Sequence, residues 1–170
     1  METEKLTSQL NKNDEWIQNA DLKLSIILAF LGVLGGIILS QGKVFNLFKH
    51  GLTVIEGFAV FAFSLAFILL GIGITTAIKG LSATLYNPHR GNWFFGDVAK
   101  YENWHYFKRA KDSETPEDEV DDLLSQIHTT SKIAIRKFKW LNLSIKLSTW
   151  SLGSFAAYFV LINIIPFIGK

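Results

Sequence analysis

The sequence predicts an all-α integral membrane protein with three transmembrane helices and a cytoplasmic helical region. Hydrophobic residues make up 49% of its 170 residues, and three long windows contain no Asp, Glu, Lys or Arg. These windows, residues 24–42, 57–78 and 147–169, are 19, 22 and 23 residues long. A bilayer core about 30 Å thick requires roughly 20 apolar helical residues, so each window approximates one span. This pattern excludes a soluble globular enzyme.

The polar segment before the first window is predicted to form a helix that leads directly into the membrane. Its stripe positions alternate at spacings of four and three residues, at Leu6, Leu10, Asn13, Ile17, Ala20 and Leu24. Such a heptad repeat is typical of a helix that packs lengthwise against a partner. Asn13 either fixes the register with that partner or weakens a short amphipathic helix. We expect an N-terminal helix at residues 1–21 and the first transmembrane helix at residues 22–42.

The positions of the basic residues predict the direction in which the chain crosses the membrane. Residues 43–56 contain 2 Lys or Arg, whereas residues 79–146 contain 11. Positively charged loops are retained in the cytoplasm, so we expect residues 80–142 to be a cytoplasmic region. The N-terminus is then cytoplasmic and the C-terminus lies on the opposite side. Residues 43–52 are predicted to form a short external turn, and residues 53–79 the second transmembrane helix.

A long helix is predicted to begin at Thr115 and to continue into the third span. The run Thr115-Pro116-Glu117-Asp118 has Thr as N-cap, Pro at the first helical position and acidic residues in the first turn. No breaker precedes Pro166, so the helix reaches the third transmembrane helix at residues 143–168. Its heptad repeat comprises Val120, Leu124, Ile127, Ser131, Ala134, Phe138 and Leu141. We expect this helix and the N-terminal helix to pack on each other or on copies from other protomers.

The sequence contains no pattern typical of catalysis, of a metal site or of a bound cofactor. It has no cysteine, no glycine-rich phosphate loop, and four histidines without metal-ligand spacing. No nucleophile can be paired with a base, so we do not expect an enzyme. The net charge of +2 is too small to indicate nucleic-acid binding. No charged residue lies deep in a span, which argues against a proton-coupled transporter or an ion pump.

An aromatic and polar segment, residues 86–101, follows the second span and is the candidate ligand site. Seven aromatic residues occupy positions 93–107, next to several hydrogen-bond donors. A nucleotide site requires both features, because cations bind the phosphate and rings stack on the base. The candidate ligand-binding residues are Asn87, His89, Arg90, Asn92, Trp93, Phe94, Lys100 and Tyr101. Aromatic and basic residues also gather at membrane interfaces and bind lipid phosphates, and composition by itself favours that second interpretation.

Two parts of the sequence resemble a known family. The first is Ala20-Asp21-Leu22-Lys23-Leu24-Ser25, at the mouth of the first span. The second comprises Asn87-Pro88-His89-Arg90-Gly91-Asn92 and Phe94-Phe95-Gly96-Asp97-Val98-Ala99. Together with the order of the helices, they resemble the transmembrane effectors of Pycsar systems, in which a pyrimidine cyclase makes cyclic CMP or cyclic UMP and an adjacent effector responds. The resemblance covers nearly the whole chain in architecture, but only these parts in sequence.

The resemblance implies a multi-pass effector of antiphage defence in the bacterial inner membrane, with the C-terminus in the periplasm. Cyclic CMP or cyclic UMP would bind the cytoplasmic region, and a homo-oligomer would then impair inner-membrane integrity and cause abortive infection. The implied partners are the cyclic nucleotide, membrane lipid and further copies of the chain, with a functional link to a pyrimidine cyclase. Among the candidate residues, Arg90, with His89 and Lys100, would hold the cyclic phosphate, and the Trp, Phe and Tyr rings would offer stacking faces.

Two alternatives from other functional classes share the predicted spans but need no nucleotide site. A ligand-independent pore-forming toxin or holin-like protein would kill cells when it is expressed alone. A small membrane scaffold protein would recruit a soluble partner through its helices and would not depolarise membranes.

Overall fold

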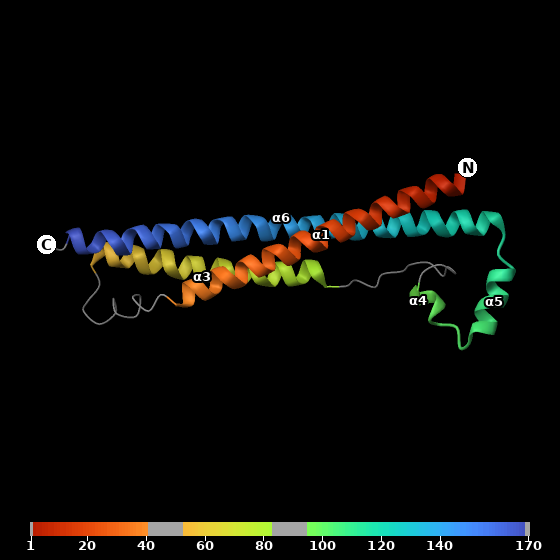
Figure 1. The fold of residues 1–170 in the computed structure, drawn as a ribbon, viewed down its shortest axis with the longest axis horizontal. Coiled ribbons are helices and arrows are strands. Elements are labelled where there is room, and N and C mark those ends of the chain that lie inside the picture. The colour runs from red at the N-terminus through yellow and green to blue at the C-terminus, as the bar shows by residue number, and fades with distance from the viewer. Residues whose placement is uncertain (1, 41–52, 83–94, 169–170) are drawn as a thin grey trace. The chain divides into compact units, whose positions relative to one another are not determined.

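Most of the chain that the structure describes is helical. The computed structural model describes residues 2–40, 53–82 and 95–168, and these ranges contain no strand. The helices are α1 (Glu2–Leu39), α3 (Val54–Leu81), α4 (Phe95–Val98), α5 (Trp104–Asp112) and α6 (Pro116–Ile168), as Figure 1 shows. The all-α fold class predicted from the sequence is therefore confirmed.

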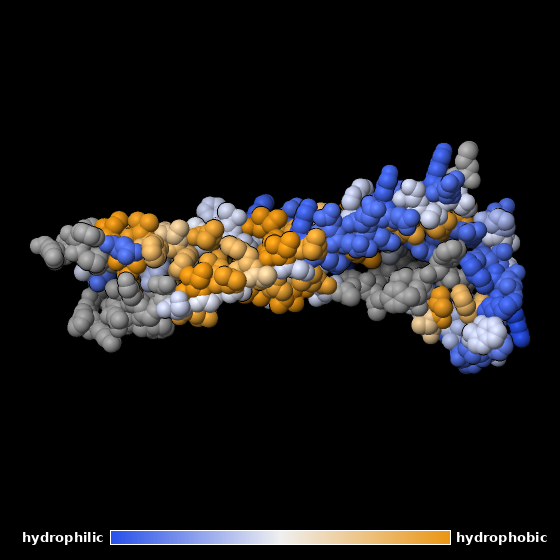
Figure 2. Space-filling model, in the orientation of Figure 1, coloured by the Kyte–Doolittle hydropathy of each residue, from blue (hydrophilic) through white to orange (hydrophobic). Residues whose placement is uncertain are grey.

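The chain divides into two compact units, and α1 and α6 contribute to both. The stalk unit contains Met1–Asp21 and Ser82–Phe138, and the membrane unit contains Leu22–Leu81 and Lys139–Lys170. Figure 2 shows hydrophobic residues gathered over the helices of the membrane unit, whereas hydrophilic residues cover those of the stalk unit. This separation agrees with a chain that places one unit in lipid and the other in water.

The membrane unit contains the three predicted spans. α1, α3 and α6 are each long and apolar enough to cross a membrane, which confirms this part of the prediction. Leu31, Leu34 and Ile38 of α1 pack with Ala66 and Leu70 of α3 in one buried cluster. Many large apolar side chains point outward instead, as expected where the solvent is lipid.

Small residues bring α3 close to its neighbours in the membrane unit. The buried positions of α3 are Ala59, Ala62, Ala66, Leu70, Gly73, Thr76, Ala77 and Gly80, which repeat at spacings of about three and four residues. A Cβ atom on Gly80 would lie 2.7 Å from Leu24 Cδ1 and 3.0 Å from Trp140 Cβ, so any side chain there would force these neighbours to shift. Such small residues let helices approach closely in lipid, where hydrophobicity provides no driving force between them.

Hydrogen bonds between helices complete this packing. The hydroxyls of Thr76 and Ser144 lie 2.9 Å apart, and Ser151 Oγ donates to the Ala66 carbonyl at 2.8 Å. Ser144 and Ser151 are fully buried, so each hydroxyl exchanges lipid for a polar partner on α3. The faces of α3 and α6 are thus small and polar at these hydroxyls, whereas the buried Tyr158 of α6 packs on Ala59 and Ala62 of α3.

In the stalk unit, α1 and α6 run parallel and pack on each other. Asn13 Nδ2 lies within hydrogen-bonding distance of the Ile127 carbonyl (3.1 Å), Thr130 Oγ1 (3.0 Å) and Ser131 Oγ (2.9 Å). Asn13 is only 3% exposed, so this side chain fixes the register of the two helices. Of the two interpretations of Asn13, the structure supports the first. The expected packing of the two helices is also confirmed, with both helices in one chain.

The heptad repeat predicted on α6 is wrong at Leu124, whereas Ile127, Ala134 and Leu141 are buried as predicted. Leu123 is buried and Leu124 is 47% exposed, whereas the sequence had placed Leu124 in the stripe. Lys137 is likewise buried, next to the predicted Phe138, because its Nζ lies 2.5 Å from Asp21 Oδ1 on α1. The packing of α1 therefore decides which residues of α6 are buried in the contact between the two helices, called the α1/α6 seam below. A lysine can lie in this seam when its charge is paired.

Candidate functional site

Most of the candidate ligand residues lie outside the described residues. Asn87, His89, Arg90, Asn92, Trp93 and Phe94 fall within residues 83–94, and their predicted roles remain predictions. Lys100 and Tyr101 are described, and both belong to the stalk unit next to α4 and α5. These two residues and the helices around them form the described part of the candidate site.

Lys100 holds a buried carboxylate. Its Nζ lies 2.5 Å from Asp97 Oδ1 on α4, and the Asp97 side chain is only 5% exposed. The Lys100 side chain is itself 67% exposed, so the ammonium reaches solvent while it neutralises Asp97. A phosphate that bound Lys100 would have to compete with this carboxylate, and the predicted role of Lys100 stays a prediction.

Tyr101 packs against α5. Its ring centroid lies 5.6 Å from that of Phe107, and the two rings are inclined at 57°. Asn103 Oδ1 then caps α5 by accepting hydrogen bonds from the backbone amides of His105 and Tyr106, at 3.0 and 3.3 Å. The cap and the ring contact fix where α5 begins relative to Tyr101.

α5 presents aromatic and basic side chains that the sequence analysis did not select as ligand residues. Trp104 is 64% exposed and Tyr106 is 49% exposed, and the Arg109 guanidinium lies over the Tyr106 ring, 5.9 Å from its centroid. Exposed rings beside a guanidinium are the groups that stack on a base and bind a phosphate. The run of aromatics at positions 93–107 already extended into this helix, and that signal could have identified it.

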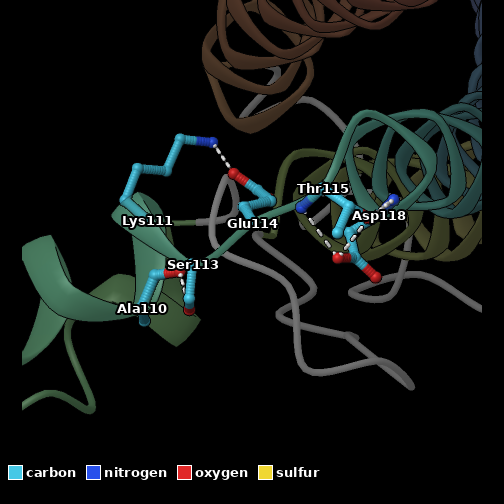
Figure 3. Close-up of polar contacts among 6 residues, drawn as sticks. All are labelled: Ala110, Lys111, Ser113, Glu114, Thr115 and Asp118. Carbon is cyan, nitrogen blue, oxygen red and sulfur yellow. Dashed lines mark hydrogen bonds and ion pairs between the residues drawn. The ribbon is translucent and has the colours of Figure 1, made fainter.

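The connection from α5 to α6 is held by a chain of polar contacts, drawn in Figure 3. Lys111 pairs with Glu114, and Ser113 Oγ donates to the Ala110 carbonyl at 2.9 Å. Thr115 Oγ1 donates to Asp118 Oδ2 at 2.7 Å and accepts from the Asp118 amide at 3.2 Å. This reciprocal capping box confirms the helix start predicted from the sequence. Figure 3 shows how these contacts connect the end of α5 directly to the first turn of α6.

The same contacts perturb one titratable group. Hydrogen bonds from the Thr115 side chain and then from its backbone amide lower the pKa of Asp118 below its ordinary value. The ionised carboxylate is the form that accepts both bonds, so it is favoured. An ionised Asp118 also suits the positive end of the helix dipole.

A buried amide lies beside the α1/α6 seam. Gln126 Nε2 is buried and has no hydrogen-bond partner among the residues that the structure describes. On the facing helix, burial raises the pKa of Asp14, the residue next to Asn13. Buried donors are almost always paired in native proteins, so the Gln126 amide is the kind of group that a polar ligand satisfies.

The described residues do not contain a group of three or more His, Cys, Asp or Glu that could hold a metal ion. What this part of the chain offers is cations, rings and hydrogen-bond donors in the stalk unit, away from the apolar spans. Cations, rings and donors are the kinds of groups that bind an anionic aromatic ligand.

The helices thus define a three-span membrane protein that carries a helical region outside its spans. Residues 5–164 match the profile described as the Pycsar effector protein domain, and the chain belongs to this family. Membership supports a role as an effector of antiphage defence, with a functional link to a cyclase and a cyclic nucleotide signal. The resemblance noted in the sequence is confirmed.

Two relatives of the chain carry the family's name. The chain is 28% identical over 141 residues to the Pycsar effector protein PtPycTM of Propioniciclava tarda, covering 78% of this chain and 66% of that protein. It is 26% identical over 180 residues to the Pycsar effector protein GmPycTM of Gulbenkiania mobilis, covering 93% of this chain and 90% of that protein. The match thus spans just under two thirds of the length of PtPycTM. No solved structure matches the chain.

Proposed function

We propose that the chain is an inner-membrane effector that cyclic CMP or cyclic UMP activates to impair membrane integrity and cause abortive infection. The family match over residues 5–164 carries this proposal, because it includes both the stalk unit and the spans. In the proposed orientation the stalk unit is cytoplasmic, where a pyrimidine cyclase would make the ligand. The 11 basic residues in positions 79–146 support that orientation.

The ligand binds the stalk unit in this proposal. Arg90 is the proposed phosphate ligand, because a guanidinium can bind a phosphate bidentately. Among the described residues, Arg109 with Tyr106 offers a second cation beside a ring, and Gln126 offers a buried amide without a partner. These groups are polar and aromatic, as a cyclic pyrimidine mononucleotide requires.

Binding can activate the protein only if the ligand prefers the active arrangement of the helices to the resting one. In the resting arrangement described here, Asn13 and Lys137 occupy the α1/α6 seam and hold its register through polar contacts. α1 and α6 each continue from the stalk unit into the membrane unit, so these two helices provide a route by which a change of register in the stalk would reach the spans. The proposed outcome is assembly of a homo-oligomer that breaches the membrane.

Calorimetry with purified protein tests the ligand directly. Cyclic CMP or cyclic UMP should bind the wild type, and Arg90→Ala should weaken binding by about 10- to 150-fold, because a lost charge-assisted contact costs about 1.5–3 kcal/mol. Arg136→Ala, which removes an exposed arginine of α6, is the matched control and should bind normally. Equal binding by Arg90→Ala and wild type would remove Arg90 from the site.

The buried amide of Gln126 supplies a second variant for the same measurement. Gln126→Leu removes a donor that has no partner among the described residues, so the unliganded protein should melt at the same temperature or higher. If the ligand accepts a hydrogen bond from this amide, the variant should bind it about tenfold more weakly. A lower melting temperature with unchanged affinity would identify Gln126 as a structural residue.

Toxicity in cells separates the effector from a ligand-independent toxin or a scaffold. The effector should kill only when a pyrimidine cyclase is active in the same cell. Killing without any cyclase, together with no binding of either nucleotide, would favour a constitutive pore-forming toxin.

A further inference from the structure

We infer that copies of this chain contact each other through their stalk units, with the outer face of α1 in one copy packed along the outer face of α6 in the next. The inference rests on the proposed function for its homo-oligomer, and it names the surfaces that form it. The outer face of α1 is defined here by Lys5, Glu15 and Trp16. The outer face of α6 is defined by Asp121, Leu124, Lys132 and Ile135.

Both outer faces expose large apolar side chains on helix segments whose other exposed residues are mostly polar or charged. Trp16 is 55% exposed, Leu124 is 47% exposed and Ile135 is 61% exposed. All three lie in the stalk unit, outside the apolar windows that would contact lipid. Apolar groups gathered on a water-facing surface and rimmed by charges are typical of a protein interface.

The charges on the two outer faces lie at matching heights. Within one chain, Asn13 lies at the same height as Thr130, 117 residues further along the sequence. Asp21 lies at the same height as Lys137, 116 residues further along. The same separation places Lys5 level with Asp121, and Glu15 level with Lys132. All four of these charged residues are exposed, and no ion pair within the described part of the chain includes them.

The membrane fixes which residues of two copies can meet. Every copy inserts the same spans into the same bilayer, so equivalent residues lie at equal depth. An α6-to-α6 contact would therefore place Asp121 beside Asp121 and Lys132 beside Lys132, and like charges at such close range repel. An α1-to-α6 contact instead places Lys5 beside Asp121 and Glu15 beside Lys132. It also places Trp16 within one helical turn of Ile135, because they differ in height by about three residues.

Because the charges on the two outer faces are complementary, we infer that the molecule that binds each face is a second copy of the chain. The alternating order, basic then acidic on α1 and acidic then basic on α6, matches over about 11 residues, or about 16 Å of helix. The contact can be made twice in a two-fold pair or once per neighbour in a ring, and both assemblies contain it.

Disulfide trapping tests the contact, because the natural chain has no cysteine. Lys5→Cys and Asp121→Cys chains with different tags would be expressed together, and their isolated membranes oxidised with and without cyclic CMP or cyclic UMP. A mixed disulfide dimer is expected, and each single variant alone should form several-fold less dimer. The chain that carries both cysteines should form covalent dimers or a ladder of higher oligomers.

A control pair of cysteines at different depths tests whether crosslinking requires the two residues to lie at the same level. Lys139 is exposed on α6 but lies 18 residues beyond Asp121, or about 27 Å along the helix, so Lys5→Cys with Lys139→Cys should not form the mixed disulfide. Equal trapping of this off-level pair, or stronger trapping of Lys5→Cys with itself, would overturn the proposed contact. Trapping of neither pair with or without ligand would overturn it as well.

Charge reversal gives an independent measurement in full-length protein. Lys5→Glu and Asp121→Lys should each lower the fraction of oligomer in mild detergent, by about two- to fivefold for an exposed pair, and the double variant should recover it. Failure of the double variant to recover would contradict the pairing.

Different results would contradict the activation by a cyclic nucleotide and the contact between copies. A chain that forms the Lys5–Asp121 crosslink but binds neither nucleotide would contradict the proposed activation and leave the interface standing. A chain that depolarises membranes on addition of ligand, without the crosslink, would contradict the interface alone.

Discussion

The two units are built from the same two long helices but are held together by different means. In the membrane unit, small residues of α3 such as Ala66 and Gly80 allow close approach, and hydroxyls of α6 bond to α3. In the stalk unit, the larger side chains Asn13 and Lys137 reach from one helix to the other. The packing of the spans therefore depends on the close approach of small side chains, and the packing of the stalk helices depends on specific polar contacts.

The difference follows from the surroundings of each unit. Lipid is as apolar as a leucine side chain, so helices in a bilayer gain little from burying apolar surface and must rely on close contact. In water the apolar seam itself provides stability, and buried polar groups then decide which register is adopted. A ligand would thus find the stalk easier to rearrange than the spans, since polar partners can be exchanged.

The largest expected effect is a substitution that breaks the close fit in the membrane unit. Gly80→Leu would force a side chain into the space between Leu24 and Trp140, and overpacking of this kind typically costs about 1–3 kcal/mol. The melting temperature in mild detergent should fall clearly. Gly71→Leu is the matched control, because nothing lies within 4 Å of a Cβ there, and it should be nearly neutral. Equal loss for both variants would mean that fit at Gly80 is not what holds the spans.

The next effect concerns the polar partner in the stalk unit. Asn13→Ala should destabilise the stalk by about 1–2 kcal/mol, because Thr130 and Ser131 lose their buried donor. Amide hydrogen exchange of α1 and of the first half of α6 should become faster, while the spans stay protected. Asn11→Ala, an exposed neighbour on the same helix, should leave exchange unchanged. Faster exchange in the spans as well would show that the two units do not respond separately.

The smallest effect is expected at the start of α6. Thr115→Ala should cost about 1 kcal/mol, since it removes the hydroxyl that joins Asp118 in the capping box. Exchange in the first turn of α6 should rise, with no change at Asn13 or in the spans. No change in that turn would contradict a stabilising cap.

The same capping box predicts a dependence on pH. The folded protein lowers the pKa of Asp118, so its contribution is present above the ordinary value of 3.8 and is lost as pH falls through the lowered pKa. Helix content in the first turn of α6 should therefore decrease below about pH 4, and Thr115→Ala should make that decrease smaller. An identical acid response in both proteins would assign the effect to other carboxylates.

Much of the fold could be predicted because its signals are local. Charge-free windows of about 20 residues identified the spans, and the run Thr115-Pro116-Glu117-Asp118 identified the start of α6. The choice of Leu124 over Leu123 for the seam was wrong because both are leucines, and only the partner helix decides which one is buried. Lys137 was missed since a lysine enters a seam only when an acid such as Asp21 faces it, and that pairing spans 116 residues.

The candidate site was less predictable than the fold. The aromatic run at positions 93–107 indicated the region, but spacing does not reveal that Lys100 is already paired with a buried Asp97. Nor does it reveal that Arg109 lies over Tyr106 on a short helix of its own. Such roles depend on side chains that meet through tertiary contacts.

Leakage from reconstituted vesicles measures whether a cyclic pyrimidine nucleotide makes this protein breach a membrane. Purified protein would be inserted into liposomes that contain anionic lipid and a trapped fluorescent dye, and either cyclic CMP or cyclic UMP would be added to the side of the stalk unit. Dye release should depend on one of these nucleotides, be absent without it, and be strongly reduced by Arg90→Ala. Release of dye without any nucleotide, or none with either nucleotide at concentrations that saturate binding, would contradict the proposed activation.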